Sequence, residues 1–339
     1  MRYNISIPEV NNRGFTLIEL MISMVIGVVL LTAVYGVFIS SSDSYRRLQG
    51  LASIQERGRI AINILQDTIR LADYTGCRAS VVVRNGLKSP FNYEYSFGQG
   101  IEGFDSTGTA WSPTIETSIP SPLAAGGDVI TVRGPVGNPV QLTAGMGSDA
   151  DVLSVPSGSP FVINNIMMIT NCSGAADVFQ KTDAGGVAVT TVAHSGGENS
   201  STSLGSVYDA GALVTRVETV SFFIRVNTDG MRSLWWKEGA ADAQEIIEGV
   251  DGMQILYGVT TNTDTSANRY LTAAEVDAAG QWAEVVSVRI GLLIATTGSV
   301  LRTLDTDTYN LLGTVYGPFN DYRVRRLFLT NIVLRNRSF

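Results

Sequence analysis

An uninterrupted apolar segment near the N-terminus constrains this chain more than any other feature. Leu20–Ile39 is almost entirely apolar, and no charged residue occurs from Leu20 to Ser42. A helix of about 20 residues is about 30 Å long, which matches the hydrocarbon core of a bilayer. Later apolar runs are shorter and contain arginine, so they are interpreted as strands. The sequence therefore predicts one membrane-spanning helix.

The charges before this segment predict its orientation. Within the first 14 residues Arg2 and Arg13 outnumber the single acid, Glu9. Positive charge on that side places the N-terminus in the cytoplasm. The apolar stretch runs on without the small-residue cleavage site that follows the apolar part of a secretory signal peptide. We therefore expect a retained single-pass anchor with most of the chain outside the cytoplasm.

A carboxylate stands at the start of the apolar run. Glu19 follows Gly14-Phe15-Thr16-Leu17-Ile18, and a carboxylate costs roughly 2.5–3.5 kcal/mol at the centre of a membrane helix and less near an end. Two local interpretations exist. Glu19 lies at the level of the lipid headgroups, or Thr16 and Glu19 form a capping box with Thr16 as the N-cap.

The segment Arg13–Glu19, followed by a long apolar helix, resembles the type IV prepilin signal. The resemblance implies that residues 1–14 are a leader, which a prepilin peptidase removes on the cytoplasmic side by cutting after Gly14. It implies that Phe15 becomes the N-methylated first residue and that Glu19 is required for assembly.

A physical reason for such a carboxylate can be stated independently. After cleavage the chain begins with an amine at Phe15 in apolar surroundings, and Glu19 of a neighbouring helix can neutralise it. An unpaired buried charge is costly, so a correctly staggered pair specifies the register of a helix bundle. Glu19 is then an assembly residue rather than a catalytic one.

The helix is predicted to continue beyond the membrane. No proline occurs from Val10 to Ser89, and one helix is expected from about Phe15 to about Tyr74. Its part 15–40 would span the membrane or lie in a filament core, and its part 41–76 would lay one apolar face on a globular domain. The apolar stripe that predicts this face consists of Leu51, Ile54, Ala61, Leu65, Ile69 and Ala72.

Residues 77–339 have the pattern of an extracytoplasmic domain rich in strands. The fold class is α+β, with the long N-terminal helix packed on a largely antiparallel sheet. A hairpin turn is expected at Val226–Met231, a short helix opening with a capping box at Thr272–Glu275, and long loops at 98–127 and 171–211. The candidate strands are Val81–Arg84, Asp128–Arg133, Asp151–Val155, Phe161–Thr170, Val187–Ala193, Leu213–Val226, Met231–Lys237, Met253–Thr261, Ala283–Thr296 and Val324–Arg335.

The chain has two cysteines, Cys77 just after the long helix and Cys172 just after a strand. Outside the cytoplasm two cysteines favour one disulfide, and the alternative is a pair of buried free thiols. The chain-entropy model gives a loop of ~95 residues up to about 4.7 kcal/mol of stabilisation. We therefore predict a Cys77–Cys172 disulfide.

Three C-terminal segments carry a second resemblance. Glu248–Gly258, Trp282–Arg289 and Arg325–Asn336 are similar to PilW-type minor pilins of the type IV pilus. The family implies a pilin-like fold and assembly through the N-terminal helix with other minor pilins and the major pilin. It also implies a complex that initiates pilus assembly, located at the tip with a PilY-type adhesin in some systems.

The leading hypothesis is therefore a structural minor pilin, processed by prepilin peptidase and incorporated into or priming a type IV pilus. Adhesion, twitching motility or DNA uptake would follow from that role. Its location would be the inner membrane, with the globular domain in the periplasm, and then the pilus. One alternative is a J-type minor pseudopilin of type II secretion. The other is a membrane-anchored binding domain outside any filament, indifferent to Glu19.

Other function classes find little support. No catalytic set, cofactor motif or metal-ligand set is recognisable, and the net charge of −7 disfavours direct nucleic-acid binding. The lone His194 is expected to be solvent-exposed in a loop. Asp305–Asp307 and Asn262–Asp264 are expected to be surface turns rather than calcium loops. An aromatic group expected to pack in the core comprises Phe91, Tyr93, Tyr95, Phe97, Phe104 and Trp111.

Overall fold

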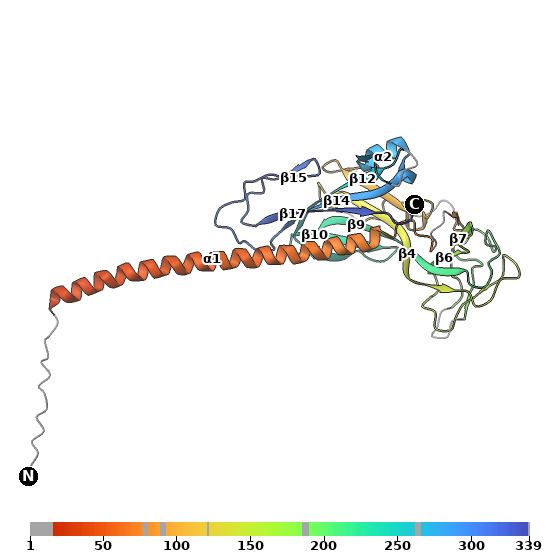
Figure 1. Ribbon diagram of the computed structural model, residues 1–339, viewed down its shortest axis with the longest axis horizontal. Helices are drawn as coiled ribbons and strands as arrows, with labels where there is room; N and C mark the ends of the chain where they lie inside the picture. Colours follow the sequence, from red (N-terminus) through yellow and green to blue (C-terminus); the bar gives the residue numbers. More distant parts are fainter. Residues whose placement is uncertain are drawn as a thin grey trace, which may run out of the picture. The chain divides into compact units, whose positions relative to one another are not determined.

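The computed structural model describes residues 16–76, 81–88, 93–120, 122–184, 190–261 and 266–337. The chain divides into two compact units, Met1–Gly50 and Leu51–Phe339. The first long element, α1 (Leu17–Ile69), is one unbroken helix with residues in both units (Figure 1). The expected α+β fold, with a long N-terminal helix and a largely antiparallel sheet, is confirmed.

Helix α1 ends five residues before the expected Tyr74, and the reason is local. The last turn tightens, because the N–H groups of Leu71 and Ala72 donate to carbonyls only three residues back. Asp73 then takes a left-handed conformation (φ 57°), and its N–H donates to Arg133 O at 3.1 Å. The chain is therefore hydrogen-bonded to Arg133 of a strand directly after the helix ends.

The larger sheet of the domain has nine strands, and every pairing except β1 with β7 is antiparallel. Its order is β1-β7-β6-β9-β4-β2-β3, and β10 pairs with both β9 and β11. The strands are β1 (Val82–Asn85), β2 (Ile101–Ser106), β3 (Trp111–Ser112), β4 (Val129–Gln141), β6 (Ile166–Thr170), β7 (Ala175–Gln180), β9 (Leu213–Val226), β10 (Arg232–Glu238) and β11 (Gln244–Glu248).

The second sheet is fully antiparallel, in the order β13-β12-β14-β17. Its strands are β12 (Val250–Val259), β13 (Arg269–Leu271), β14 (Val285–Ala295) and β17 (Arg325–Val333). The remaining elements are two small pairs, a short helix and two 3-10 turns: β5 (Leu153–Ser154), β8 (Thr191–Val192), β15 (Tyr309–Leu311), β16 (Thr314–Tyr316), α2 (Ala273–Ala279), η1 (Tyr93–Tyr95) and η2 (Trp282–Glu284).

The main core lies between the second half of α1 and both sheets (Figure 1). Gly58 marks the closest approach, because a Cβ there would lie 2.3 Å from the Phe328 ring of β17. The expected stripe is confirmed except for Leu51, which is half-buried. Its buried members pack with the sheet residues of the same cluster: Ile54, Ala61, Leu65, Ile69 and Ala72 with Phe222, Leu234, Met253, Ile255, Ile290, Leu292 and Ile332.

A second core belongs to residues 142–212, which we call the distal lobe, with Val214 at its border. It gathers around β5, β6, β7 and β8, and its largest buried side chains include Tyr208 and Phe179. The predicted long loop at 171–211 is wrong in part, because it contains β7, whereas β8 lies within the candidate strand Val187–Ala193. The predicted loop at 98–127 is also wrong in part, because it contains β2 and β3.

Strand β7 was missed because its sequence, Ala-Ala-Asp-Val-Phe-Gln, has little intrinsic strand preference. Its environment supplies the stabilisation instead. The buried carboxylate of Asp177 accepts hydrogen bonds from the Gly205 N–H (2.9 Å) and the Tyr208 hydroxyl (2.7 Å). Two predicted strands of the lobe, Asp151–Val155 and Phe161–Thr170, are shorter than expected. Asn164 in the left-handed region (φ 68°) interrupts the segment before β6.

Two local predictions are confirmed. The hairpin between β9 and β10 turns at Asn227, whose side chain accepts from the N–H groups of Asp229 and Met231, both at 3.0 Å. Helix α2 has its capping box, in which Thr272 and Glu275 each accept the backbone N–H of the other, at 3.4 and 2.9 Å. Short polar motifs of this kind fold by interactions within a few residues.

Candidate functional site

The N-terminal unit presents Glu19 at the start of α1. The Glu19 Oε2 accepts hydrogen bonds from the Thr16 N–H (3.0 Å) and the Thr16 hydroxyl (2.9 Å), and the Glu19 N–H donates to Thr16 Oγ1 (3.3 Å). These bonds form a capping box. The capping interpretation therefore describes Glu19 in the isolated chain, where the carboxylate is exposed. Gly14 and Phe15 lie outside the described residues.

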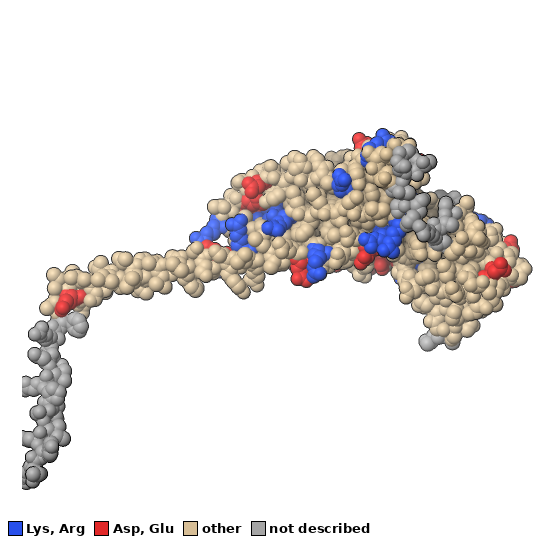
Figure 2. All heavy atoms as spheres, viewed as in Figure 1, with Lys and Arg blue, Asp and Glu red and all other residues tan. Residues whose placement is uncertain are grey.

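The helix that follows Glu19 exposes an apolar surface. Its side chains from Leu17 (79% exposed) to Phe38 (68% exposed) face solvent, and its length and composition are sufficient to cross a membrane. Figure 2 shows an acidic group at the start of the helix and no charged group along the apolar stretch. Such a surface is stable only when lipid or other apolar helices cover it.

Cys172 follows β6 in the left-handed region (φ 58°). Its predicted partner, Cys77, lies outside the described residues. Cys172 is not a free thiol in the part of the chain that the structure describes. The Cys77–Cys172 pairing stays a prediction.

The prediction for His194 is wrong. His194 is 3% exposed and packs edge-on against Phe179, with ring centroids 5.7 Å apart. Its Nε2 lies 2.9 Å from Asp151 O, so the imidazole bonds a backbone carbonyl inside the distal lobe. The Gly-rich sequence around it indicated a loop correctly but did not indicate that the lobe folds over that loop.

The expectation of a surface turn at Asp305–Asp307 is wrong for Asp305, which is 5% exposed. Its carboxylate accepts from Arg325 Nη1 at 2.8 Å, and Arg325 also bonds Asp251 (2.8 Å) and Asp321 (2.7 Å). The Arg325 guanidinium lowers the pKa of the Asp321 carboxyl below its usual range by hydrogen bonding. No sequence signal links these residues, because they come from three distant segments. Asn262–Asp264 lies outside the described residues.

The buried carboxylate of Asp128 joins the two sheets. Asp128 precedes β4 and accepts hydrogen bonds from the N–H groups of Ser106 (2.9 Å) and Ile255 (2.8 Å). Burial raises the pKa of Asp128 to about 7, opposed by these hydrogen bonds. Its own N–H donates to Met253 O at 2.9 Å. Asp128 therefore holds strand β12 of one sheet against β4 of the other.

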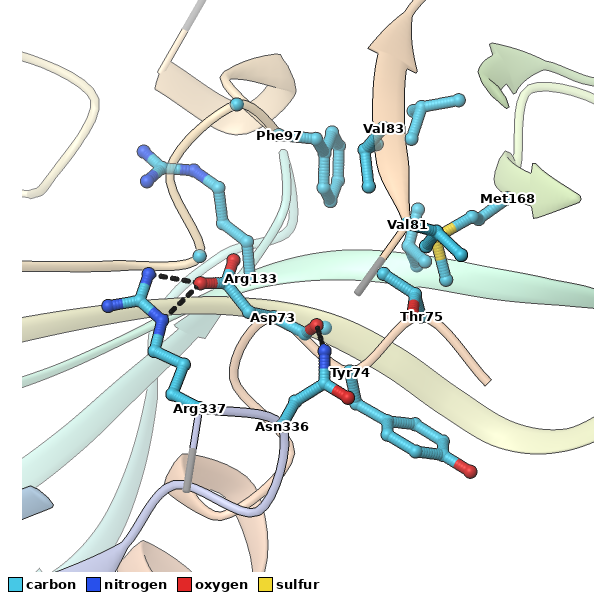
Figure 3. A pocket seen from close by; sticks show the side chains of 15 residues that line it. Asp73, Tyr74, Thr75, Val81, Val83, Phe97, Arg133, Met168, Asn336 and Arg337 are labelled. Atoms are coloured by element: carbon cyan, nitrogen blue, oxygen red, sulfur yellow. Dashed lines mark hydrogen bonds and ion pairs between the residues drawn. The ribbon is translucent and has the colours of Figure 1, made fainter. Parts of the chain in front are cut away.

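A pocket of about 320 Å³ lies where the chain leaves α1 (Figure 3). One wall is apolar, and the rim carries an ion pair between Asp73 and Arg337 (Figure 3). Asn336 donates to Asp73 O at the same rim. The other labelled residues that line it are Tyr74, Thr75, Val81, Val83, Phe97, Arg133 and Met168.

The charged side chains that line this pocket make hydrogen bonds that stabilise the fold. Arg133 Nη1 donates to Gln99 O at 2.9 Å, and Arg133 Nη2 donates to Glu102 at 2.9 Å. Thr75 Oγ1 is buried without a hydrogen-bond partner in the described part of the chain. A hydroxyl nucleophile is activated by a hydrogen bond to a base, and the Thr75 hydroxyl has no such bond in the described lining. The aromatics Tyr93 and Phe97 beside it are buried, as core packing predicts.

Comparisons with known proteins give two matches. Residues 10–35 match the model of the prokaryotic N-terminal methylation motif, and residues 221–336 match the model of type IV pilus-assembly protein W. No curated protein and no solved structure matches the chain. The second match begins within β9 and covers β10–β17, which include all four strands of the second sheet and also β10 and β11 of the larger sheet. Neither match covers residues 36–220, which include the whole distal lobe.

Both matches agree with the residues that carry the resemblances in the sequence. The methylation motif covers Gly14, Phe15 and Glu19, and the assembly domain covers the buried Asp251–Arg325 pair. The matched family is named for its part in pilus assembly. The chain therefore carries the domain of the type IV pilus-assembly protein W family behind an N-terminal methylation motif, as expected of a PilW-type pilin.

Proposed function

We propose that this chain is a minor pilin that enters a type IV pilus, or primes its assembly, through the first half of α1. The observation that carries the proposal is the exposed apolar surface of that helix directly behind a methylation motif. An apolar helix of this length is held by lipid before assembly and by neighbouring helices after it. Lipid and neighbouring helices can each cover the same apolar side chains, so the subunit can pass from the membrane into the filament.

Processing is the first step of the proposal. A prepilin peptidase removes residues 1–14 by cutting after Gly14, and the new N-terminus at Phe15 is methylated. Arg2 and Arg13 keep the leader in the cytoplasm, so the inner membrane holds 15–40, and 41–76 continues the helix outward. The domain 77–339 then lies in the periplasm, where a Cys77–Cys172 disulfide would be stable.

Assembly is the second step, and Glu19 has two successive roles in it. In the isolated subunit its carboxylate caps α1 through Thr16. In the pilus or priming complex it neutralises the Phe15 amine of a neighbouring subunit. The proposed partners are other minor pilins, the major pilin and a PilY-type adhesin at the tip.

Intact and N-terminal mass spectrometry of the protein from its own host tests the proposal. We expect a chain that begins with methylated Phe15 and is recovered with sheared pili. A chain that retains residues 1–14 would contradict both filament functions and favour an ordinary anchor. A processed chain that copurifies with a secretion pseudopilus instead would support the J-type alternative.

A further inference from the structure

Strand β17 lies at one edge of the second sheet. Among the strands that the structure describes, β17 pairs with β14 alone and ends the order β13-β12-β14-β17. A strand at the edge of a sheet presents unpaired N–H and C=O groups, which form a template for a further strand. Natural edges are commonly protected by short length, by inward charges or by proline. β17 has nine residues and no proline.

The backbone bonds fix which residues face this edge. The Leu334 N–H donates to Val286 O at 3.0 Å, and the Thr296 N–H donates to Val324 O at 2.9 Å. Because hydrogen-bonded residues alternate along an antiparallel pair, the even-numbered residues of β17 bond β14. Leu327, Leu329, Asn331 and Val333 therefore direct their N–H and C=O groups outward, and none of these groups has a backbone partner in the described part of the chain.

The side chains divide in the same way. On one face Phe328 packs at Gly58 of α1, and Thr330 accepts from Gln66 Nε2 at 2.7 Å. On the other face Leu327, Leu329 and Val333 are 40, 62 and 49% exposed. The same residues thus offer free backbone groups and exposed apolar side chains, which is the arrangement that strand addition uses.

Charge indicates what kind of strand fits. Arg326 and Arg335 stand at the two ends of the edge, exposed and without an ion pair in the described part of the chain. Their neighbours Arg325 and Arg337 are both paired. No acidic residue occurs from Arg325 to Arg337. The free positive charges at both ends complement acidic side chains on an incoming strand.

A second copy of the same strand fits poorly. The antiparallel register that overlaps the apolar residues fully would set Leu327 opposite Val333. The strand of a second copy has no acidic side chain from Arg325 to Arg337, so it offers no partner to the exposed Arg326 and Arg335 of the first.

We propose that the β17 edge binds an extended strand of a different protein chain, apolar on alternate residues and acidic at its ends. The strand adds to the sheet beside β17 and covers Leu327, Leu329 and Val333. The inference goes beyond the proposed pilin role and does not rest on it, because it concerns only the domain's own sheet.

The test uses the full chain in detergent micelles and a dye-labelled peptide about ten residues long, the length of the edge at ~3.4 Å per residue. The peptide alternates valine with threonine and has glutamate at both ends. Fluorescence anisotropy measures its affinity, and NMR hydrogen exchange follows individual amides. We expect binding that slows exchange at Leu329, Asn331 and Val333, and weaker binding of a peptide with lysine ends.

Asn331→Pro and Asn331→Thr form the matched pair of variants. Proline at 331 removes an outward N–H but no bond to β14, so the sheet should persist, whereas threonine keeps the N–H. We expect Asn331→Pro to weaken peptide binding about tenfold and Asn331→Thr to leave it unchanged.

Three results would overturn the proposal: no binding, undiminished binding by Asn331→Pro, or equal binding of a peptide N-methylated on its pairing edge. The N-methylated peptide keeps the test decisive even where Asn331→Pro fails to fold. Self-association of the chain that Asn331→Pro abolishes would instead assign the edge to a second copy and contradict the choice of partner. All of these outcomes are independent of processing at Gly14.

Discussion

Substitution of Glu19 separates the two roles proposed for its carboxylate. In the structure Glu19 Oε2 accepts the Thr16 N–H at 3.0 Å and the Thr16 hydroxyl at 2.9 Å. A glutamine at this position can supply the same acceptor oxygen, because a capping box tolerates Glu or Gln. Glu19→Gln therefore keeps the cap and removes the charge, whereas Glu19→Ala removes both.

The two roles predict free-energy losses of different size. Loss of an N-terminal cap costs about 1 kcal/mol, which is about fivefold in an equilibrium. Removing one member of a buried charge pair costs about 3–5 kcal/mol, which is a hundredfold or more. Loss of the carboxylate also eases membrane insertion of the monomer slightly. This gain is smaller than the pairing loss, so the net effect opposes assembly.

We therefore expect Glu19→Gln to reduce assembly by about a hundredfold or more, and Glu19→Ala to reduce it by at least as much because it also loses the cap. The measurement is the amount of processed protein in sheared pili relative to the membrane fraction, with intact mass confirming cleavage after Gly14 in each variant. Wild-type incorporation of Glu19→Gln together with a mild defect of Glu19→Ala would show that Glu19 acts only as a cap. Such a result would refute the pairing mechanism and leave the family assignment intact.

Three further predictions concern the domain. The pKa of Asp128 is raised to about 7 from an ordinary 3.8, so the protonated carboxyl favours the folded state. The free energy of unfolding should therefore fall by about 4 kcal/mol as pH rises from about 4 to 7. Denaturant unfolding of Asp128→Asn should show a smaller dependence of this free energy on pH, and an unchanged dependence would contradict the assignment. Arg325→Met leaves the carboxylates of Asp251 and Asp305 buried without their main partner, so unfolding should show a loss of about 3–5 kcal/mol, whereas the exposed neighbour Arg326→Met should change stability by less than about 0.5 kcal/mol. Non-reducing peptide mapping should join Cys77 to Cys172, and alkylation of both thiols without prior reduction would exclude the bond.

The sequence was informative where structure depends on short-range pattern. The spacing of Ile54, Ala61, Leu65 and Ile69 predicted the buried face of α1, because a helix repeats its environment every 3.6 residues. The hairpin at Asn227 and the cap at Thr272 were also correct, since side chains within four residues make their hydrogen bonds.

The sequence was uninformative where structure depends on distant partners. Strand β7 is held by its neighbours and by the bonds of Asp177 rather than by strand preference. The burial of His194 depends on Phe179 and on the backbone of Asp151, which no spacing relates to it. For the candidate site, the motif identified Glu19, but the arrangement of Arg325 with its three carboxylates required the fold.

The distal lobe has its own consequence for how this chain can vary. Because Tyr208, Phe179 and their neighbours form a core separate from that beneath α1, a substitution there disturbs few contacts of the assembly helix. Local unfolding of the lobe need not unfold the rest. Substitutions on the surface of the lobe can therefore occur without altering the packing of α1 against the sheets.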